Sequence, residues 1–306
     1  MWISLCVALS AGVVLTLSAP RTARRLPPRA AAWMLTSAAV IAAGAWVAVL
    51  AMLGVTFVGQ IPQVAAEGRW SPRVLAADNP LDWPVAAACA VGALGCLAAL
   101  VVSAYRWVRV FVRARHDFRP LPTSGDLAVL DDPAPVAFAL PGAPGRIVVS
   151  TGMLRALNAD ERRALLAHER AHLRHRHHVF LLVLQLAAAA NPLLRPLTRA
   201  GAHALECWAD ESAGAVVADR HLVARAVARA ALATGRAPQP ALAATGGPVP
   251  QRVQALLAPP TPLRRRLVVA VAALMVICCA GPALTAHDVD QLFDAAAPAR
   301  TEAPEH

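Results

Sequence analysis

Long runs of apolar residues alternate along this chain with short, strongly charged segments. The runs at residues 30–58, 81–105 and 267–284 are each long enough for a bilayer-crossing helix, which takes about 20 residues. A shorter run at 2–19 has no basic residue before it and several arginines soon after it, the reverse of a cleaved signal peptide. We therefore predict four transmembrane helices, at 2–19, 30–58, 81–105 and 263–286.

The arginines predict how these helices are oriented. All 29 basic residues are arginine. Twelve of them gather in three segments beside the apolar runs, namely 21–29, 106–119 and 264–266. Basic residues beside a span favour the cytoplasmic side, whereas the 60–80 loop is balanced in charge and the tail is acidic. We predict a multi-pass plasma-membrane protein with both termini outside.

This pattern divides the chain into four parts. They are a membrane domain at 1–116, a cytoplasmic domain at 117–262, a last span at 263–286 and an extracytoplasmic tail at 287–306.

Composition agrees with a membrane protein. The apolar fraction of 57% and the mean hydropathy of +0.50 are too high for a soluble globule. The net charge of +10 is explained by anchors at an anionic lipid surface, so we expect no direct nucleic-acid binding. Five of the six cysteines lie in apolar runs, which favours buried small side chains over a disulfide framework.

Within 117–262 the pattern changes to short β-prone runs and then a helix. Residues 136–140 and 146–150 flank a Pro/Gly-rich turn, which predicts an antiparallel pair of strands. Asn158 then predicts a helix N-cap with Glu161 as its capping-box partner. No helix breaker follows before residue 178, so we predict one continuous helix over that stretch.

This helix carries the motif H-E-x-x-H. His168 and His172 are one turn apart and face the same side, so both imidazoles can bind one ion, with Glu169 beside them. Glu206 follows 34 positions after His172 and predicts a third ligand, and Asp210 predicts a partner for the free N–H of a ligand histidine. This is the gluzincin pattern, with one zinc ion per chain. The alternative is a solvated, charged helix.

Three further histidines, His175, His177 and His178, come just before the apolar stretch VFLLVLQLAAAA. Their position favours a basic helix face at the membrane interface rather than metal ligands.

The stretches VAFALPGAPGRIVVSTGML, LLAHERAHLRHRHH and ECWAD together resemble the membrane gluzincins of the BlaR/MecR family and, more distantly, HtpX-type membrane proteases. The resemblance implies a mainly α membrane protein with a cytoplasmic α+β zincin domain between its third and fourth transmembrane helices. It also implies a zinc endopeptidase with His168, His172 and Glu206 as ligands and Glu169 as base. Its protein substrate is often a winged-helix repressor of the BlaI/MecI type.

The resemblance stops at the C-terminus. Antibiotic-sensing relatives continue into a penicillin-binding domain, and this sequence has no S-x-x-K acylation motif. We expect any signal to arrive through the 60–80 loop, the membrane helices or an unidentified sensor partner.

The predicted chemistry is peptide hydrolysis. Zinc activates water, Glu169 takes its proton and then protonates the leaving amine. Tyr105, the single tyrosine, lies at a membrane helix end, so His203 or Arg199 is the candidate oxyanion donor. The strand at 136–140 is either an edge that pairs with an extended substrate or an ordinary strand.

Other functions remain open. A catalytically silent receptor or scaffold is disfavoured by the intact Glu169, and general quality-control proteolysis is an alternative to signalling. A metal transporter is disfavoured because the later spans lack acidic or histidine residues at mid-depth.

Overall fold

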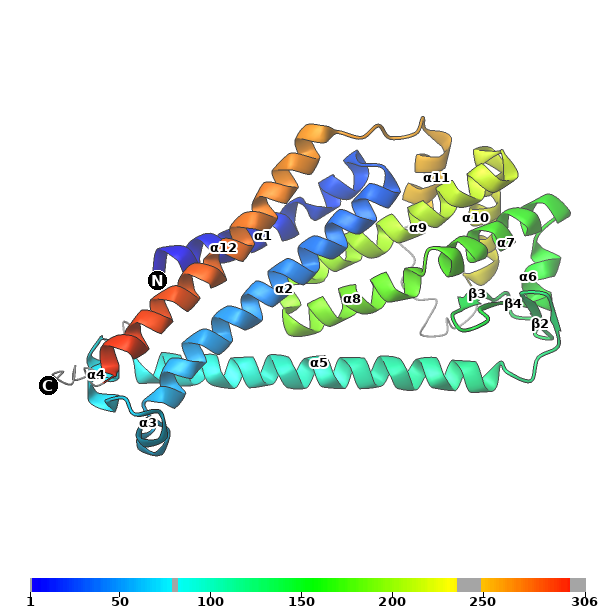
Figure 1. The fold of residues 1–306 in the computed structure, drawn as a ribbon. Coiled ribbons are helices and arrows are strands. Elements are labelled where there is room, and N and C mark those ends of the chain that lie inside the picture. The colour runs from blue at the N-terminus through cyan, green and yellow to red at the C-terminus, as the bar shows by residue number, and fades with distance from the viewer. Residues whose placement is uncertain (1, 79–81, 236–248, 298–306) are drawn as a thin grey trace, which may run out of the picture.

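The computed structural model describes residues 2–78, 82–235 and 249–297, and it is mostly helical (Figure 1). The helices are α1 (Trp2–Arg25), α2 (Pro28–Gly59), α3 (Pro62–Gly68), α4 (Pro72–Asp78), α5 (Trp83–Asp117), α6 (Thr151–Ala156), α7 (Ala159–Arg174), α8 (His177–Ala190), α9 (Arg195–Val217), α10 (Arg220–Thr234), α11 (Val249–Leu257) and α12 (Arg265–Ala296). A short 3-10 turn, η1 (Pro192–Leu194), joins α8 to α9. The strands are β1 (Thr123–Ser124), β2 (Leu127–Leu130), β3 (Ala137–Leu140) and β4 (Arg146–Ser150).

Three of the described helices, α2, α5 and α12, are long and apolar enough to cross a membrane. α2 contains the whole run predicted at 30–58. The runs predicted at 81–105 and 263–286 lie in α5 and α12 except for the first two residues of each, because these helices begin at Trp83 and Arg265. The run at 2–19 lies in α1, which is helical but is not one of those three, so its crossing of the membrane stays a prediction. α12 continues to Ala296, so the first part of the predicted tail is helical and its last residues lie outside the described ranges.

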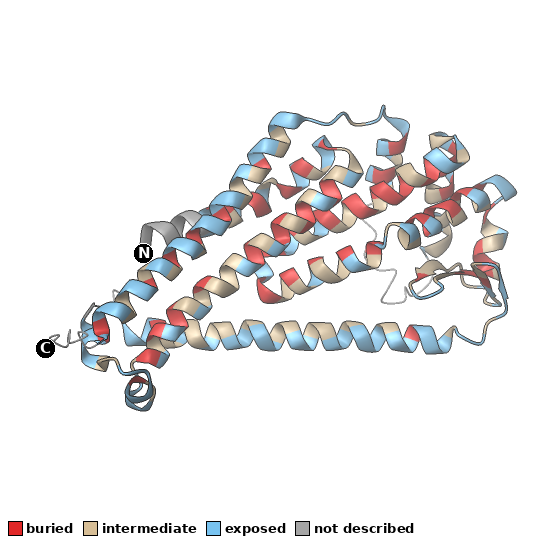
Figure 2. Cartoon of the chain, viewed as in Figure 1, coloured by how far each residue is buried: buried red, intermediate tan, exposed pale blue. Residues whose placement is uncertain are grey.

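One alanine- and leucine-rich core joins α1, α2, α8, α9 and α12. Small side chains let helix backbones approach closely, as membrane helix interfaces require. In Figure 2 buried residues line α2 and α9, whereas α5 is mostly exposed along its length. α5 is thus the helix whose apolar side chains depend most on surrounding lipid.

The apolar helix α8 packs among the helices of this bundle. The Phe180 ring meets Trp33 of α2 edge to face at 4.8 Å, and the Cys96 thiol of α5 donates to the Ala190 carbonyl at 3.2 Å. The 117–262 segment therefore packs in part against helices that are long enough to span. Its boundaries as a separate cytoplasmic domain stay a prediction.

A small mixed sheet lies beyond the end of α5, with strand order β1-β2-β4-β3. β3 and β4 pair antiparallel, which confirms the hairpin predicted at 136–140 and 146–150. The parallel pairing of β2 with β4 has no counterpart in the sequence prediction. β3 forms one edge of this sheet and packs against α7.

Candidate metal centre

The helix that carries the H-E-x-x-H motif begins as the sequence predicts. The Asn158 side chain accepts from the Glu161 N–H at 2.9 Å, and the Glu161 carboxylate accepts from the Asn158 N–H at 3.0 Å. This capping box satisfies two backbone donors at the start of α7. From there the helical period turns His168 and Glu169 inward, and each is less than a tenth exposed.

The helix does not continue to residue 178 as predicted. α7 ends at Arg174, and Arg176 adopts a left-handed backbone conformation with φ 52° before α8 begins at His177. No glycine or proline marks this break in the sequence. Tertiary packing supplies it, because α8 must turn away from α7 to enter the apolar bundle beside α2 and α5.

The break overturns the interfacial assignment of His177. Its side chain is fully buried, and its Nδ1 lies 3.0 Å from Nδ1 of His172. His175 stacks on the Trp208 ring at 4.6 Å and is half-buried. Among the described residues, the group able to hold a metal ion consists of His168, His172 and Glu206, so none of the three later histidines belongs to it.

α9 brings Glu206 and Asp210 to the two motif histidines. Nε2 of His168 and Nε2 of His172 lie 3.0 Å apart. Oxygens of Glu206 lie 3.7 Å from Nε2 of His168 and 3.5 Å from Nε2 of His172. Two ligands of tetrahedral zinc, each about 2.05 Å from the metal, are separated by about 3.3 Å. The three predicted ligands are therefore close enough together to hold one ion, and the binding of zinc stays a prediction.

The hydrogen bonding also fits a cation. Nδ1 of His168 lies 2.9 Å from Oδ1 of Asp210, so this nitrogen is placed to donate its N–H to the carboxylate, and Nε2 faces His172. Burial lowers the pKa of His168, but the hydrogen bond and charge of Asp210 outweigh burial and raise it. For His172, burial and the charge of His168 lower the pKa and keep that imidazole neutral. Two imidazoles whose Nε2 atoms face each other, with a carboxylate beside them, are suited to bind a divalent ion.

Arg252, on α11, is the residue of the site that the sequence analysis missed. Its guanidinium donates to both carboxylate oxygens of Asp210 at 2.8 and 2.7 Å, and its Nη1 lies 3.0 Å from Glu206. The side chain is 9% exposed. Arg252 lies 42 positions after Asp210, in a segment with many arginines, so no spacing rule singles it out.

Charge in the buried site is balanced by this arginine. Burial opposes ionisation of Asp210, yet hydrogen bonds from Arg252 and His168 hold the pKa of its carboxyl below the usual range. Asp210 therefore stays ionised, and its contact with Nδ1 orients the ring of His168. Its role as the partner of a metal-binding histidine stays a prediction.

Glu169 has the opposite environment. Burial, more than the nearby Glu206 charge, raises the pKa of its carboxyl, while His168 opposes the rise. A backbone hydrogen bond from Ala139 on β3 also acts on the same carboxyl. A carboxyl with a raised pKa beside a candidate metal site is suited to accept a proton and return it.

His203 lies one turn before Glu206 on α9. Its Nε2 is 3.6 Å from the Cys207 thiol, and burial lowers the pKa of the imidazole. Burial also raises the pKa of Cys207 to about 12, so this thiol is unreactive. Contact of His203 with a substrate stays a prediction.

Comparison with known proteins finds matches to parts of this chain. The chain matches Peptidase family M48 over residues 106–190, which include the H-E-x-x-H motif but not Glu206. It is 43% identical over 60 residues to a protein described as "Protease HtpX homolog" from Thermoplasma acidophilum. That alignment covers 20% of this chain and 19% of the relative, so the chain spans about a fifth of the length of the relative it matches. No solved structure matches the chain significantly.

These matches support a membrane metallopeptidase of the M48 type. They agree with the resemblance to HtpX-type proteases, whereas the resemblance to the BlaR/MecR family in particular stays a prediction. Both the motif and the helices long enough to span a membrane are consistent with that class.

Proposed function

We propose that this protein is a zinc-dependent membrane endopeptidase. The observation that carries the proposal is the convergence of His168, His172 and Glu206, with ligand atoms all within 4.8 Å of one another, beside a buried Glu169. The M48 match supports a metallopeptidase, and the donor set favours zinc, which binds two imidazoles and a carboxylate in hydrolytic sites. The binding of one ion per chain is part of the proposal.

The chain's own residues divide the chemistry between them. Zinc, when bound, supplies a Lewis acid that polarises a peptide carbonyl and activates water. Glu169 takes a proton from the attacking water and returns it to the leaving amine, and its raised pKa suits both transfers. Asp210 holds the ring of His168 in one tautomer. His203 or Arg199 is proposed to donate to the oxyanion.

β3 is proposed to hold the substrate. It is an edge strand of the described sheet, and it packs against α7, the helix of the motif. Because β3 packs against the helix that carries Glu169, and its Ala139 backbone is near enough to lower the pKa of that carboxyl, an extended peptide added along this strand would run near the proton-transfer group. Such pairing uses the substrate backbone and selects by shape more than by sequence.

The substrate is proposed to be a cytoplasmic or membrane-proximal protein. In the signalling form of this proposal it is a winged-helix repressor of the BlaI/MecI type, as the resemblance to BlaR/MecR suggests. In the quality-control form it is a membrane protein. The relative described as an HtpX homolog supports a protease but does not separate the two forms.

A substitution at Glu169 tests the proposal. Glu169→Gln is nearly isosteric and removes only proton exchange, so the variant should keep zinc and lose cleavage by at least about 10²-fold. Its complexes with uncleaved proteins should persist, and proteins that co-purify with the variant but not with the wild type are candidate substrates. Glu67→Gln, the same change at an exposed position in the 60–80 loop, is the control and should cleave normally.

The outcome decides between enzyme and scaffold. If the substrate is still processed at the wild-type rate in cells that carry Glu169→Gln, the proposed peptidase mechanism is refuted, and a silent receptor that acts beside another protease is favoured. A trapped DNA-binding repressor would support the signalling form, whereas trapped membrane proteins would support quality control.

A further inference from the structure

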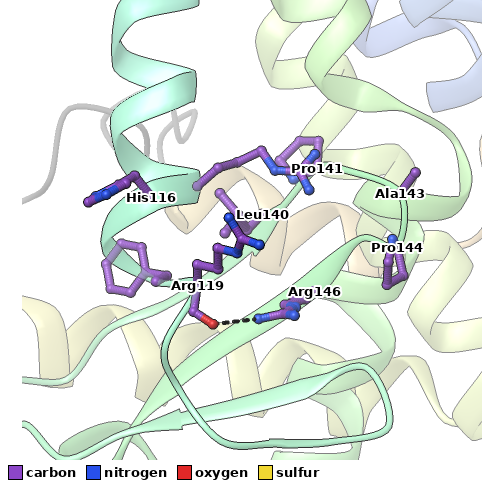
Figure 3. A pocket seen from close by; sticks show the side chains of 9 residues that line it. His116, Arg119, Leu140, Pro141, Ala143, Pro144 and Arg146 are labelled. Carbon is purple, nitrogen blue, oxygen red and sulfur yellow. Dashed lines mark hydrogen bonds between the residues drawn. The ribbon is translucent and has the colours of Figure 1, made fainter.

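A hollow of about 380 Å³ lies away from the candidate metal centre, between the C-terminal end of α5 and the β3–β4 hairpin (Figure 3). Two contacts hold its walls together. The Phe118 and Phe138 rings meet edge to face at 5.1 Å, and the Arg146 guanidinium donates to the Arg119 carbonyl at 3.3 Å. The hollow is therefore part of the packing between a helix of spanning length and the sheet.

Positive charge dominates its lining. Arg115 lies in the last turn of α5, Arg119 lies two residues after the helix ends, and Arg146 begins β4, while no carboxylate lines the hollow. The one acidic residue in this part of α5, Asp117, is exposed and faces His116 at 3.6 Å.

The arginines that line the hollow have no carboxylate partner to neutralise them. Five other arginines of the described ranges do pair with carboxylates, in Arg163–Asp160, Arg170–Asp126, Arg220–Glu211, Arg229–Glu161 and Arg252–Asp210. None of Arg115, Arg119 and Arg146 forms such a pair within the described part of the chain. A bound anion would accept hydrogen bonds from these guanidinium groups and balance their charge.

Phosphate matches this arrangement. Planar guanidinium groups donate two parallel hydrogen bonds to phosphate oxygens, and several of them can share one phosphate. The place in the fold also favours phosphate. α5 has 35 residues, about 52 Å at 1.5 Å per residue, so it is longer than the roughly 30 Å hydrocarbon layer. Its arginine-rich end therefore emerges on the lipid surface, where phosphate headgroups are concentrated.

We propose that this hollow is a binding site for a phosphate group, carried by an anionic phospholipid or by free phosphate. The bound group bridges Arg115 of α5 and Arg119, just after that helix, to Arg146 of β4. It thereby ties the sheet that contains β3 to the helix that emerges from the membrane. The proposal stands on the hollow and its charges, and it does not depend on peptidase activity.

Two probes separate the possible sources of phosphate. The full chain is placed in phosphatidylcholine nanodiscs, with or without phosphatidic acid, and inorganic phosphate is titrated separately into the phosphatidylcholine sample. A ligand that binds only the folded protein raises the midpoint of thermal unfolding. A rise with phosphatidic acid alone identifies the lipid as the source. A rise with both probes shows that free phosphate suffices, and both results support the site.

Three variants distinguish a built site from diffuse charge. Ala143→Phe fills the hollow from its exposed loop and leaves every charge in place, so affinity should fall by at least about tenfold. Arg115→Ala with Arg119→Ala should have the same effect. Arg113→Ala removes an equal charge per residue from the same helix outside the hollow, and it should bind within about twofold of wild type.

The proposal is overturned if neither probe raises the wild-type midpoint. It is also overturned if Ala143→Phe responds like the wild type, because the arginines would then attract anions without forming a site. Midpoints of all variants in phosphatidylcholine alone show whether each one folds. Should the double variant fail to fold, the comparison of Ala143→Phe with Arg113→Ala still decides the question.

Discussion

Arg252→Ala should destabilise the protein far more than a geometrically similar change elsewhere. Arg252 donates to both oxygens of Asp210 at 2.8 and 2.7 Å, and the two side chains are 9% and 2% exposed. Removing one partner of a buried pair costs about 3–5 kcal/mol, because the other charge is left without compensation. Since His168 still contacts Asp210, we expect a loss near the lower end, about 3 kcal/mol.

Arg170→Ala is the matched control. Arg170 donates to both oxygens of Asp126 at 2.7 and 2.9 Å, but these side chains are 52% and 39% exposed. Exposed pairs contribute about 0–1 kcal/mol because water and salt screen them. The two variants therefore remove pairs of the same geometry that differ in burial.

The assay is unfolding of the metal-free full chain in detergent, followed by intrinsic fluorescence as denaturant or temperature rises. A loss of about 3 kcal/mol corresponds to a melting temperature lower by about 6–12 °C. If Arg252→Ala loses no more stability than Arg170→Ala, the inference that Arg252 neutralises the buried carboxylates is wrong.

The effect of pH follows from the lowered pKa of Asp210. A carboxyl whose folded pKa is depressed contributes stability above its unfolded pKa of about 3.9, and that stability is lost as pH falls through the folded value. The wild type therefore keeps the contribution throughout the neutral range. Without Arg252, burial favours the protonated form of Asp210. Lowering the pH therefore reduces the destabilisation of the variant, because it supplies that proton. The stability gap should be widest at neutral pH and narrow toward about pH 3.9.

Further outcomes are expected from the same structure. His168→Ala combined with Glu206→Ala should abolish binding of about one zinc ion per chain, and elemental analysis that finds the wild-type zinc content would exclude these ligands. A reporter fused after Ala114 should report cytoplasm and one fused after His306 the exterior; an interior C-terminus would contradict the predicted orientation. Asn158→Ala should cost about 1 kcal/mol in the unfolding assay, because it removes the N-cap of α7, and no change would show that the cap is dispensable.

Local features of the sequence determined much of the motif helix. The capping box at Asn158 is a contact between neighbours in the chain, so it forms wherever the helix forms. The spacing of His168 and His172 places them on one face by helical geometry alone. The β3–β4 hairpin also depends on a short, turn-rich link, and the three longest helices follow from apolar length.

Tertiary structure decided how these pieces meet. The break at Arg176, which buries His177 against His172, arises because α8 packs into the bundle, and no local breaker encodes it. The contact of Arg252 with Asp210 joins two helices through residues that lie 42 positions apart in the sequence. Such contacts depend on the relative placement of whole helices, which is set by the summed packing of many side chains. Spacing could therefore identify the candidate ligands, but only the folded chain shows the arginine that balances their charge.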